Sequence, residues 1–202
     1  GGTASGKTSM LNILSNFFAP SHRIISIEDT REIKLPSFLH WLPMLTRLPN
    51  PEGRGGVTML NLLQNSLRQR PDKILVGEIR RPAEAEVLFE AIHTGHSVYA
   101  TVHANTAEET ISRLTNPPIN VPKIMVSALS LVIVQYRNRR TGNRRTFQIA
   151  EVLENGDANV LFQYDPEKDV LVKKNKSKRF IKSIETFSGI KEKELDKHLK
   201  EK

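Results

Sequence analysis

The sequence lacks cysteine, and it lacks any hydrophobic run long enough to cross a membrane. Without cysteine, the chain cannot form disulfide scaffolds, thiol nucleophiles, iron–sulfur clusters or cysteine-based zinc sites. Its longest nearly apolar stretch, residues 124–134, is interrupted by Ser127 and Ser130 and is shorter than the roughly 20 residues that span a bilayer. No signal peptide, internal repeat or low-complexity tract is visible in these residues. These absences leave an ordinary globular protein as the expectation.

The charge is basic and unevenly distributed. The 202 residues contain 30 Lys and Arg against 22 Asp and Glu, a formal charge of +8, and residues 101–202 hold 19 of the basic and 13 of the acidic side chains. The basic residues concentrate in a lysine-rich stretch, residues 173–182, and in Arg137, Arg139, Arg140, Arg144 and Arg145. Such a surface suits nucleic acid, anionic lipid or an acidic partner. The alternative is a solvated face that keeps the protein soluble.

Hydrophobic periodicity divides the chain near residue 131. Before it, a helix after the glycine-rich start and helices at residues 58–68 and 82–93 alternate with strands at residues 23–28, 73–76 and 97–102. Residues 35–56 are interpreted as a proline-rich loop. The alternation predicts an α/β fold with a mostly parallel sheet covered on both faces, which we assign to a core domain at residues 1–130.

The remainder, residues 131–202, is expected to form a smaller annex. Strand-like segments at residues 131–136 and 146–153, separated by turn sequences, predict an antiparallel meander that ends near residue 172. The last thirty residues are interpreted as two short helices broken at Gly189.

The chain opens on a sequence that matches the pattern G-x-x-x-x-G-K-[ST] and leads into an amphipathic helix. The motif consists of Gly1, Gly2, Thr3, Ala4, Ser5, Gly6, Lys7 and Thr8. Glycines let backbone N–H groups curl around a triphosphate, Lys7 reaches the β and γ phosphates, and the Thr8 hydroxyl ligates Mg²⁺. The alternative is a chance glycine loop before a helix. The motif predicts binding of ATP with Mg²⁺.

Glu78 follows the apolar strand predicted at residues 73–76. An acid at the end of a strand downstream of a phosphate loop is placed to polarise the attacking water, while a preceding Asp commonly holds the metal. Here the Asp position is Gly77, so Glu78 is the candidate base. The alternative is that Glu78 caps the next helix.

Two other strand ends carry polar side chains. Glu28 and Asp29 end the strand at residues 23–28, and His103 follows the strand at residues 97–102. Because parallel strands deliver their carboxyl ends to one edge, these side chains are expected near Glu78 and the metal, with Asp29 a candidate ligand. His103 is interpreted as a sensor of the γ-phosphate. The alternatives are a solvated acidic turn and a structural histidine.

In their order and residue content, these motifs resemble those of the type II/type IV secretion ATPases, which are hexameric motors of secretion, pilus assembly and the archaeal flagellum. Residues 1–8 are similar to the family's Walker A motif, 27–32 to its Asp box, 74–80 to its Walker B with Gly before Glu, and 94–105 to its His box. Residues 50–56 and 58–72 resemble the Tad pilus and archaeal branches, and residues 40–43 the archaeal one. The resemblance covers residues 1–135.

The resemblance implies a RecA-like fold and a homohexamer that hydrolyses ATP and drives a polytopic membrane platform protein from the cytoplasmic face of the membrane. An arginine of a neighbouring subunit would neutralise charge in the transition state, and the candidates are Arg31, Arg47 and Arg80. No specific nucleic acid is expected, because the basic stretches lack interleaved aromatic residues. The alternatives are a nucleic-acid motor with a similar core and a nucleotide-binding scaffold without turnover.

Two features depart from the family pattern. Ala4 stands where the family usually has glycine. In addition, the chain begins inside a motif without methionine, so we expect it to lack the first core strand and the N-terminal domain of the family.

Overall fold

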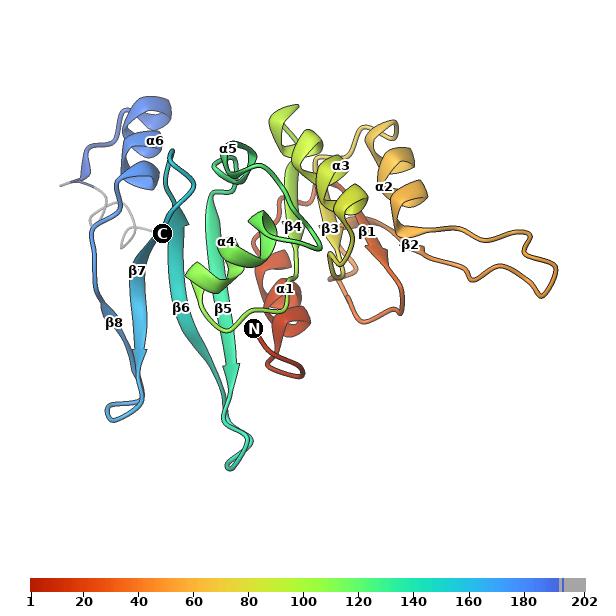
Figure 1. Cartoon of the computed structure of the whole chain (residues 1–202). Helices are drawn as coiled ribbons and strands as arrows, with labels where there is room; N and C mark the ends of the chain where they lie inside the picture. The colour runs from red at the N-terminus through yellow and green to blue at the C-terminus, as the bar shows by residue number, and fades with distance from the viewer. Residues whose placement is uncertain (193, 195–202) are drawn as a thin grey trace.

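The computed structural model describes residues 1–192 and 194, which form two four-stranded sheets with helices packed on them (Figure 1). The first sheet is parallel and has the order β2-β1-β3-β4. Its strands are β1 (Arg23–Glu28), β2 (His40–Leu45), β3 (Lys73–Val76) and β4 (Ser97–Ala100). The expected α/β fold with a mostly parallel sheet is confirmed.

Helices cover both faces of this sheet because its strands are apolar on both sides. On one face Ile24 and Leu75 pack with Leu11 of α1 (Lys7–Ser15). On the other face Ile25, Ile27 and Ile74 pack against α2 and α3. These helices span Met59–Leu67 and Pro82–His93. The sequence-based helix at residues 82–93 therefore has the same bounds as α3.

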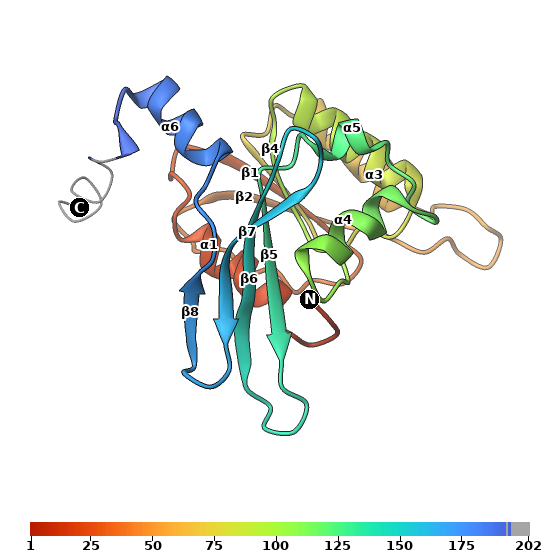
Figure 2. The same cartoon turned by 60° about the vertical axis from the view of Figure 1, so that its left-hand side comes forward.

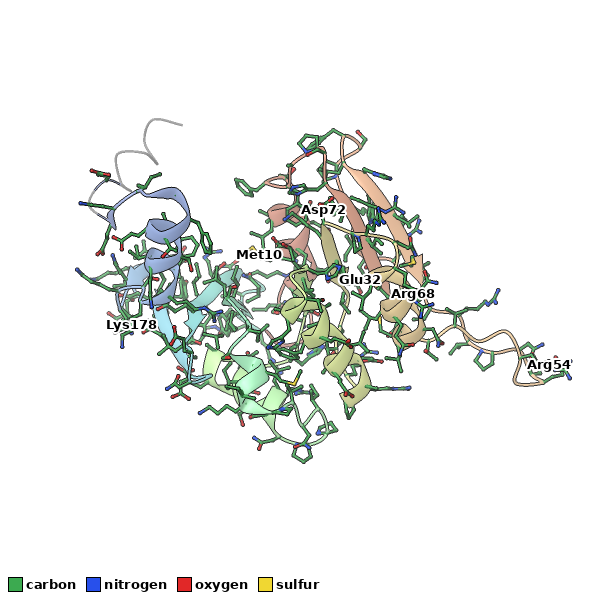
Figure 3. All side chains as sticks on the ribbon, turned by 90° about the horizontal axis from the view of Figure 1, so that it is seen from above. Met10, Glu32, Arg54, Arg68, Asp72 and Lys178 are labelled. Atoms are coloured by element: carbon green, nitrogen blue, oxygen red, sulfur yellow. The ribbon has the colours of Figure 1, made fainter. Side chains whose placement is uncertain are left out.

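One strand was not expected. The residues 35–56 interpreted as a loop contain β2, which pairs with β1 from Arg23↔His40 to Glu28↔Leu45. Pro43 lies within β2 opposite Ser26, and proline is tolerated there because β2 is an edge strand, where one side of the backbone needs no ladder donor. After β2 the chain extends into an arm at residues 46–57 that projects from the body with Arg54 near its tip (Figure 3).

The second sheet is antiparallel, in the order β5-β6-β7-β8, and confirms the expected meander. It comprises β5 (Leu131–Arg137), β6 (Arg144–Val152), β7 (Ala158–Asp165) and β8 (Val170–Lys173). An apolar cavity of about 190 Å³ separates the edge of β4 from β5 and reaches Gly1 and Lys7. β5 and the glycine-rich start of the chain therefore line the same cavity.

Three further helices complete the described residues. α4 (Ala107–Thr115) and the short α5 (Lys123–Val126) were not expected from the sequence. α6 (Arg179–Ser188) ends at Gly189, whose φ of 72° stops the helix as predicted. The helix expected after Gly189 falls largely on residues 193 and 195–202, which lie outside the described residues. Within the described part of the chain, no helix is both long and apolar enough to span a membrane.

Candidate nucleotide site

The glycine-rich loop, residues 1–6, presents a helix N-terminus to solvent. Gly6, with a φ of 98°, precedes α1 and has no side chain that could cap the first turn of the helix. The first N–H groups of α1 therefore remain available to an anion. Lys7 Nζ lies 3.0 Å from the carbonyl oxygens of both Gly1 and Gly2, so its charge is held over the loop. This arrangement suits the binding of phosphate groups.

The loop is packed closely against its surroundings. A Cβ on Gly1 would collide with the backbone oxygen of Gln135 in β5 and with the hydroxyl of Ser5. Ser5 is buried, and its Oγ donates to the carbonyl of Gly2 at 2.8 Å. Ala4 adopts a φ of 55°, a left-handed conformation that glycine tolerates better than alanine. Only glycine fits at position 1, whereas the alanine at position 4 is strained.

Arg144 reaches this loop from the second sheet. Its Nε donates to the carbonyl of Ala4 at 3.0 Å, and its Cδ would lie 3.5 Å from a Cβ on Gly6. In the sequence, Arg144 belongs to a basic cluster and nothing assigns it to the site. No local signal distinguishes it from Arg139 or Arg140, because the contact joins residues 140 positions apart.

An acidic residue that was not singled out, Glu32, contacts the predicted metal ligand. Thr8 Oγ1 donates to Glu32 Oε2 at 2.8 Å. Glu28 holds this segment in place, since its Oε1 accepts hydrogen bonds from the N–H groups of Glu32 at 2.9 Å and Ile33 at 2.8 Å. Glu28 is itself only 2% exposed. Glu28 thus supports the site from inside, and Glu32 is the acid that faces Thr8.

Glu78 lies at the centre of a cluster formed by three strand ends. His103 Nε2 lies 3.1 Å from its Oε1, and Arg80 Nη2 donates to its Oε2 at 2.7 Å. Arg80 also pairs with Asp29 through Nη1 at 3.2 Å. The structure therefore brings Asp29, Glu78 and His103 together, as the sequence predicted. It does so through Arg80, which is also a candidate donor to a neighbouring subunit.

Glu78 does not cap the following helix. Glu84 Oε2 instead accepts hydrogen bonds from the N–H groups of Arg80 at 3.2 Å and Arg81 at 3.1 Å, at the start of α3. The Glu78 carboxylate consequently keeps its contacts with Arg80 and His103. It remains partly accessible, with 19% of its side chain exposed.

The electrostatics of the cluster keep Glu78 ionised and His103 neutral at pH 7. Burial alone would raise the pKa of Glu78, but the hydrogen bond from Arg80, the positive charge that His103 carries in the acidic range where Glu78 titrates, and the charges of Arg80 and Lys7 lower it below its usual value. Burial and the charge of Lys7 lower the pKa of His103. Burial also lowers the pKa of Lys7, against the attraction of Glu78 and Glu32. A neutral His103 can donate Nε2–H to the carboxylate.

Three further predicted site residues make no contact with Glu78 in the described part of the chain. Thr3 and Arg31 are exposed, and within the described residues Arg31 makes no side-chain hydrogen bond or ion pair. Arg47 lies at the base of the arm, where its Nε donates to the carbonyl of Gly55 at 2.7 Å. The structure therefore does not bring Arg31 and Arg47 to Glu78.

The residues present fit a Mg²⁺–triphosphate group better than a metal bound by protein ligands alone. Among the described residues, no group of three or more His, Asp or Glu side chains is arranged to hold a metal. The Thr8 hydroxyl and the Glu32 carboxylate offer a small oxygen set next to the loop. Mg²⁺ commonly takes one or two such ligands and completes its shell with phosphate and water. Thr8 is thus the candidate ligand, while Asp29 is already paired with Arg80.

Comparison with known proteins identifies the family and the fold of the chain. A model of the family described as "Type II/IV secretion system protein" matches residues 1–175. An uncharacterised protein of Methanocaldococcus jannaschii is 41% identical over 207 residues, which cover 96% of this chain and 74% of that protein. VirB11 of Agrobacterium fabrum is 43% identical over 103 residues, 51% of this chain and 29% of that protein.

Solved structures share the fold. The VirB11 ATPase of the Brucella suis type IV secretion system superposes with a TM-score of 0.62 at 24% identity, covering 77% of this chain and 47% of that one. The pilus retraction motor PilT with bound ADP gives a TM-score of 0.55 at 24% identity, covering 100% of this chain and 52% of that one. The chain thus spans about half of the length of these structures.

Proposed function

The chain belongs to the type II/IV secretion system protein family, and from this membership we propose that it is an ATP-hydrolysing motor. In this proposal, identical subunits form a hexameric ring at the cytoplasmic face of the membrane. Turnover drives a polytopic membrane platform protein that secretes protein or assembles a filament. The relatives named VirB11 ATPase and pilus retraction motor support this class of activity.

The observation that carries the proposal is the convergence of the phosphate loop with the Glu78 cluster. The N atom of Gly1 lies 3.5 Å from the carbonyl oxygen of Val102, which precedes His103, and Thr8 Oγ1 donates to Glu32 Oε2 at 2.8 Å, although these residues come from different parts of the chain. The loop N–H groups and Lys7 would bind the phosphates, and Thr8 and Glu32 would hold Mg²⁺ when it is bound. Bound Mg²⁺ supplies charge neutralisation on the phosphate oxygens.

Glu78 would accept a proton from the attacking water at its carboxylate. Its low pKa keeps it unprotonated, and Arg80 with His103 fixes its orientation. His103, being neutral, can redirect its Nε2–H from Glu78 to a phosphate oxygen without introducing a charge change. This exchange of partners is the sensing role we propose for His103.

Arg80 is proposed to position Glu78 within its own subunit. Its guanidinium is shared between Glu78 and Asp29 of the same chain, so reaching a neighbour's nucleotide would break two ion pairs. Arg31 and Arg47 are exposed and make no ion pair within the described residues. They are the better candidates to complete the site of an adjacent subunit.

Substitution of Lys7 by alanine tests the proposal. ATP turnover should become unmeasurable, because Lys7 supplies the positive charge that is held over the loop. The matched control is Lys34→Ala, which removes an exposed lysine from the segment after β1. Lys34→Ala should hydrolyse ATP like the wild type. Turnover in Lys7→Ala equal to that of the control would contradict the assignment of the phosphate loop.

Mixed rings test which arginine acts across the interface. Lys7→Ala subunits are mixed in equal amounts with subunits carrying Arg31→Ala, Arg47→Ala or Arg80→Ala. An arginine that acts on its neighbour should be supplied by the Lys7→Ala subunit, restoring up to about a quarter of wild-type turnover in a ring of head-to-tail interfaces. We expect restoration with Arg31→Ala or Arg47→Ala and none with Arg80→Ala. Restoration with Arg80→Ala would contradict the positioning role.

A further inference from the structure

The hairpin between β5 and β6 carries positive charge without a balancing negative charge of its own. Residues 137–145 contain five arginines and no Asp or Glu. Figures 1 and 2 both show this hairpin extending past the glycine-rich start of the chain, at the same end of the molecule. The arginines therefore lie at the end of the protein where the phosphate loop is found.

The turn of the hairpin is ordered by its own hydrogen bonds. The N–H group of Asn138 donates to the carbonyl of Asn143 at 2.8 Å. Asn138 Oδ1 accepts hydrogen bonds from the N–H groups of Arg140 at 2.9 Å and Thr141 at 3.1 Å. The backbone that carries the arginines is thus fixed by the fold itself.

On one face of the hairpin the positive charge is balanced. Arg145 Nε and Nη2 donate to the two carboxylate oxygens of Asp169, at 2.6 and 2.7 Å. The Tyr164 hydroxyl donates to the same carboxylate at 2.7 Å. In the ladder between β5 and β6, Arg145 stands opposite Tyr136. This face of the hairpin needs no further anion.

The opposite face has a pair of arginines whose charge is not balanced. Arg137 lies directly opposite Arg144 in the ladder, and the side chains of such a pair project from the same face of a sheet. Like charges in this arrangement repel each other and destabilise the hairpin. Among the described residues, neither arginine forms an ion pair. An anion held between them would replace the repulsion with two attractive contacts.

This second face is the one that meets the phosphate loop. Arg144 Nε donates to the carbonyl of Ala4 at 3.0 Å, and the two Nη groups of Arg144 have no hydrogen-bond partner among the described residues. Two residues before Arg137, Gln135 donates from Nε2 to Thr146 Oγ1 at 3.0 Å, and its backbone oxygen lies against Gly1. The pair of arginines therefore adjoins the loop that is expected to bind phosphate.

We propose that Arg137 and Arg144 form a second phosphate-binding site, which lies beside the phosphate loop and contacts a phosphate group of the bound nucleotide. The planar guanidinium group matches two phosphate oxygens at once, and a phosphate carries the negative charge that the pair lacks. Lys7 and the first N–H groups of α1 would hold the nucleotide from the loop, and the two arginines would hold it from the second sheet. This inference rests on the proposed binding of ATP at the loop. The same chemistry would take free inorganic phosphate, and the test distinguishes the two sources.

The direct test compares the binding of a non-hydrolysable ATP analogue to the wild-type full chain and to Arg137→Gln. We expect about fivefold weaker binding by the variant, the size of one exposed charge contact. The difference between the two affinities should shrink as salt is raised. Arg137→Lys keeps the charge, so it should bind the analogue more tightly than Arg137→Gln does.

A matched control and a stability measurement separate ligand binding from a structural role. Arg139 is an exposed arginine in the turn of the same hairpin and has no arginine opposite it, so Arg139→Gln should bind the analogue like the wild type. Without ligand, the urea midpoint of Arg137→Gln should be no lower than that of the wild type, because the repulsion from Arg144 has been removed. Loss of an arginine that supported the fold would lower this midpoint.

Two further measurements identify the source of the phosphate and separate this inference from the proposed function. Inorganic phosphate titrated into the chain saturated with the analogue should not bind. Binding that Arg137→Gln abolishes would keep the anion site but assign it to free phosphate. Lys7→Ala should lose the analogue altogether. If Lys7→Ala loses it and Arg137→Gln binds it normally, the phosphate loop stands and the arginine site is refuted; if Lys7→Ala still binds it, the proposed function is refuted.

Three results would overturn the proposal. One is an unchanged affinity of Arg137→Gln for both the analogue and inorganic phosphate. Another is an equal loss of affinity in Arg139→Gln, which would indicate only the general positive potential of the hairpin. The third is tighter binding of a single-stranded oligonucleotide that Arg137→Gln, Arg139→Gln and Arg140→Gln weaken equally, which would assign the hairpin to nucleic acid.

Discussion

Acidification is expected to release α6 from the second sheet through protonation of Glu151. Burial would raise the pKa of Glu151, but the hydrogen bonds from Lys178, Ser177 and Asn159 outweigh it and lower the pKa to about 2. A folded-state pKa below the unfolded value means that the carboxylate stabilises the fold fully above about pH 4.5. This stabilisation is lost as the pH falls toward 2.

The size of this stabilisation follows from the difference between the folded-state and unfolded-state pKa values of Glu151. A pKa of about 2 against 4.5 corresponds to about 3 kcal/mol of stabilisation at pH 7. Glu151→Gln should therefore lower the free energy of unfolding by up to this amount at pH 7 and by much less at pH 2. Glu154→Gln is the control, since Glu154 is an exposed carboxylate three residues away, and it should change stability by less than about 0.5 kcal/mol.

Urea denaturation between pH 7 and pH 2 measures both effects, and amide hydrogen exchange reports whether α6 opens first. In Glu151→Gln the exchange of the α6 amides should accelerate at pH 7, while amides of β1 and β3 stay protected. The reasoning is refuted if Glu151→Gln is as stable as Glu154→Gln at pH 7. It is equally refuted if the stability of both variants falls with the same slope between pH 4.5 and pH 2.

Two further predictions concern the phosphate loop. Arg144→Gln should raise the KM for ATP about fivefold, because one hydrogen bond to the loop contributes about 1 kcal/mol. The control Arg140→Gln, in the same hairpin, should leave the KM unchanged. Equal KM values for the two variants would contradict the contact between Arg144 and the loop. Ala4→Gly should raise the free energy of unfolding by about 0.5–1 kcal/mol in urea denaturation, because it relieves a left-handed alanine. The same change at exposed Ala83 in α3 should lower stability by about 1 kcal/mol, and a loss at both positions would contradict the strain at Ala4.

The elements with strong apolar patterns were predictable from the sequence. The strands at residues 23–28 and 73–76 have the same bounds in the structure, because each is a continuous apolar run buried in the sheet. β2 was missed because Pro43 is normally a sign against a strand, and only its position at the sheet edge allows it. α4 was missed although its N-terminal cap is visible in the sequence. Thr106 caps the helix by accepting a hydrogen bond from the N–H of Glu109, and a threonine followed three residues later by a glutamate is a capping pattern.

The candidate site was predictable as far as strand ends determine it. Parallel strands place Asp29, Glu78 and His103 at one edge whatever their side-chain conformations are. The pairing of Arg80 with Glu78 and Asp29 depends on a side-chain conformation, and the contact of Arg144 depends on how two sheets pack. Neither leaves a periodic pattern in the sequence, so neither could be inferred from it.

The most direct test of the central claim is to measure ATP binding and ATP turnover in Glu78→Gln. The substitution keeps the shape of the side chain and removes the carboxylate that would accept the proton. We expect near-normal affinity for ATP and a loss of turnover on the order of a hundredfold or more, the size expected for a general base. Unchanged turnover, or loss of ATP binding, would contradict the assignment of Glu78 as the residue that activates water.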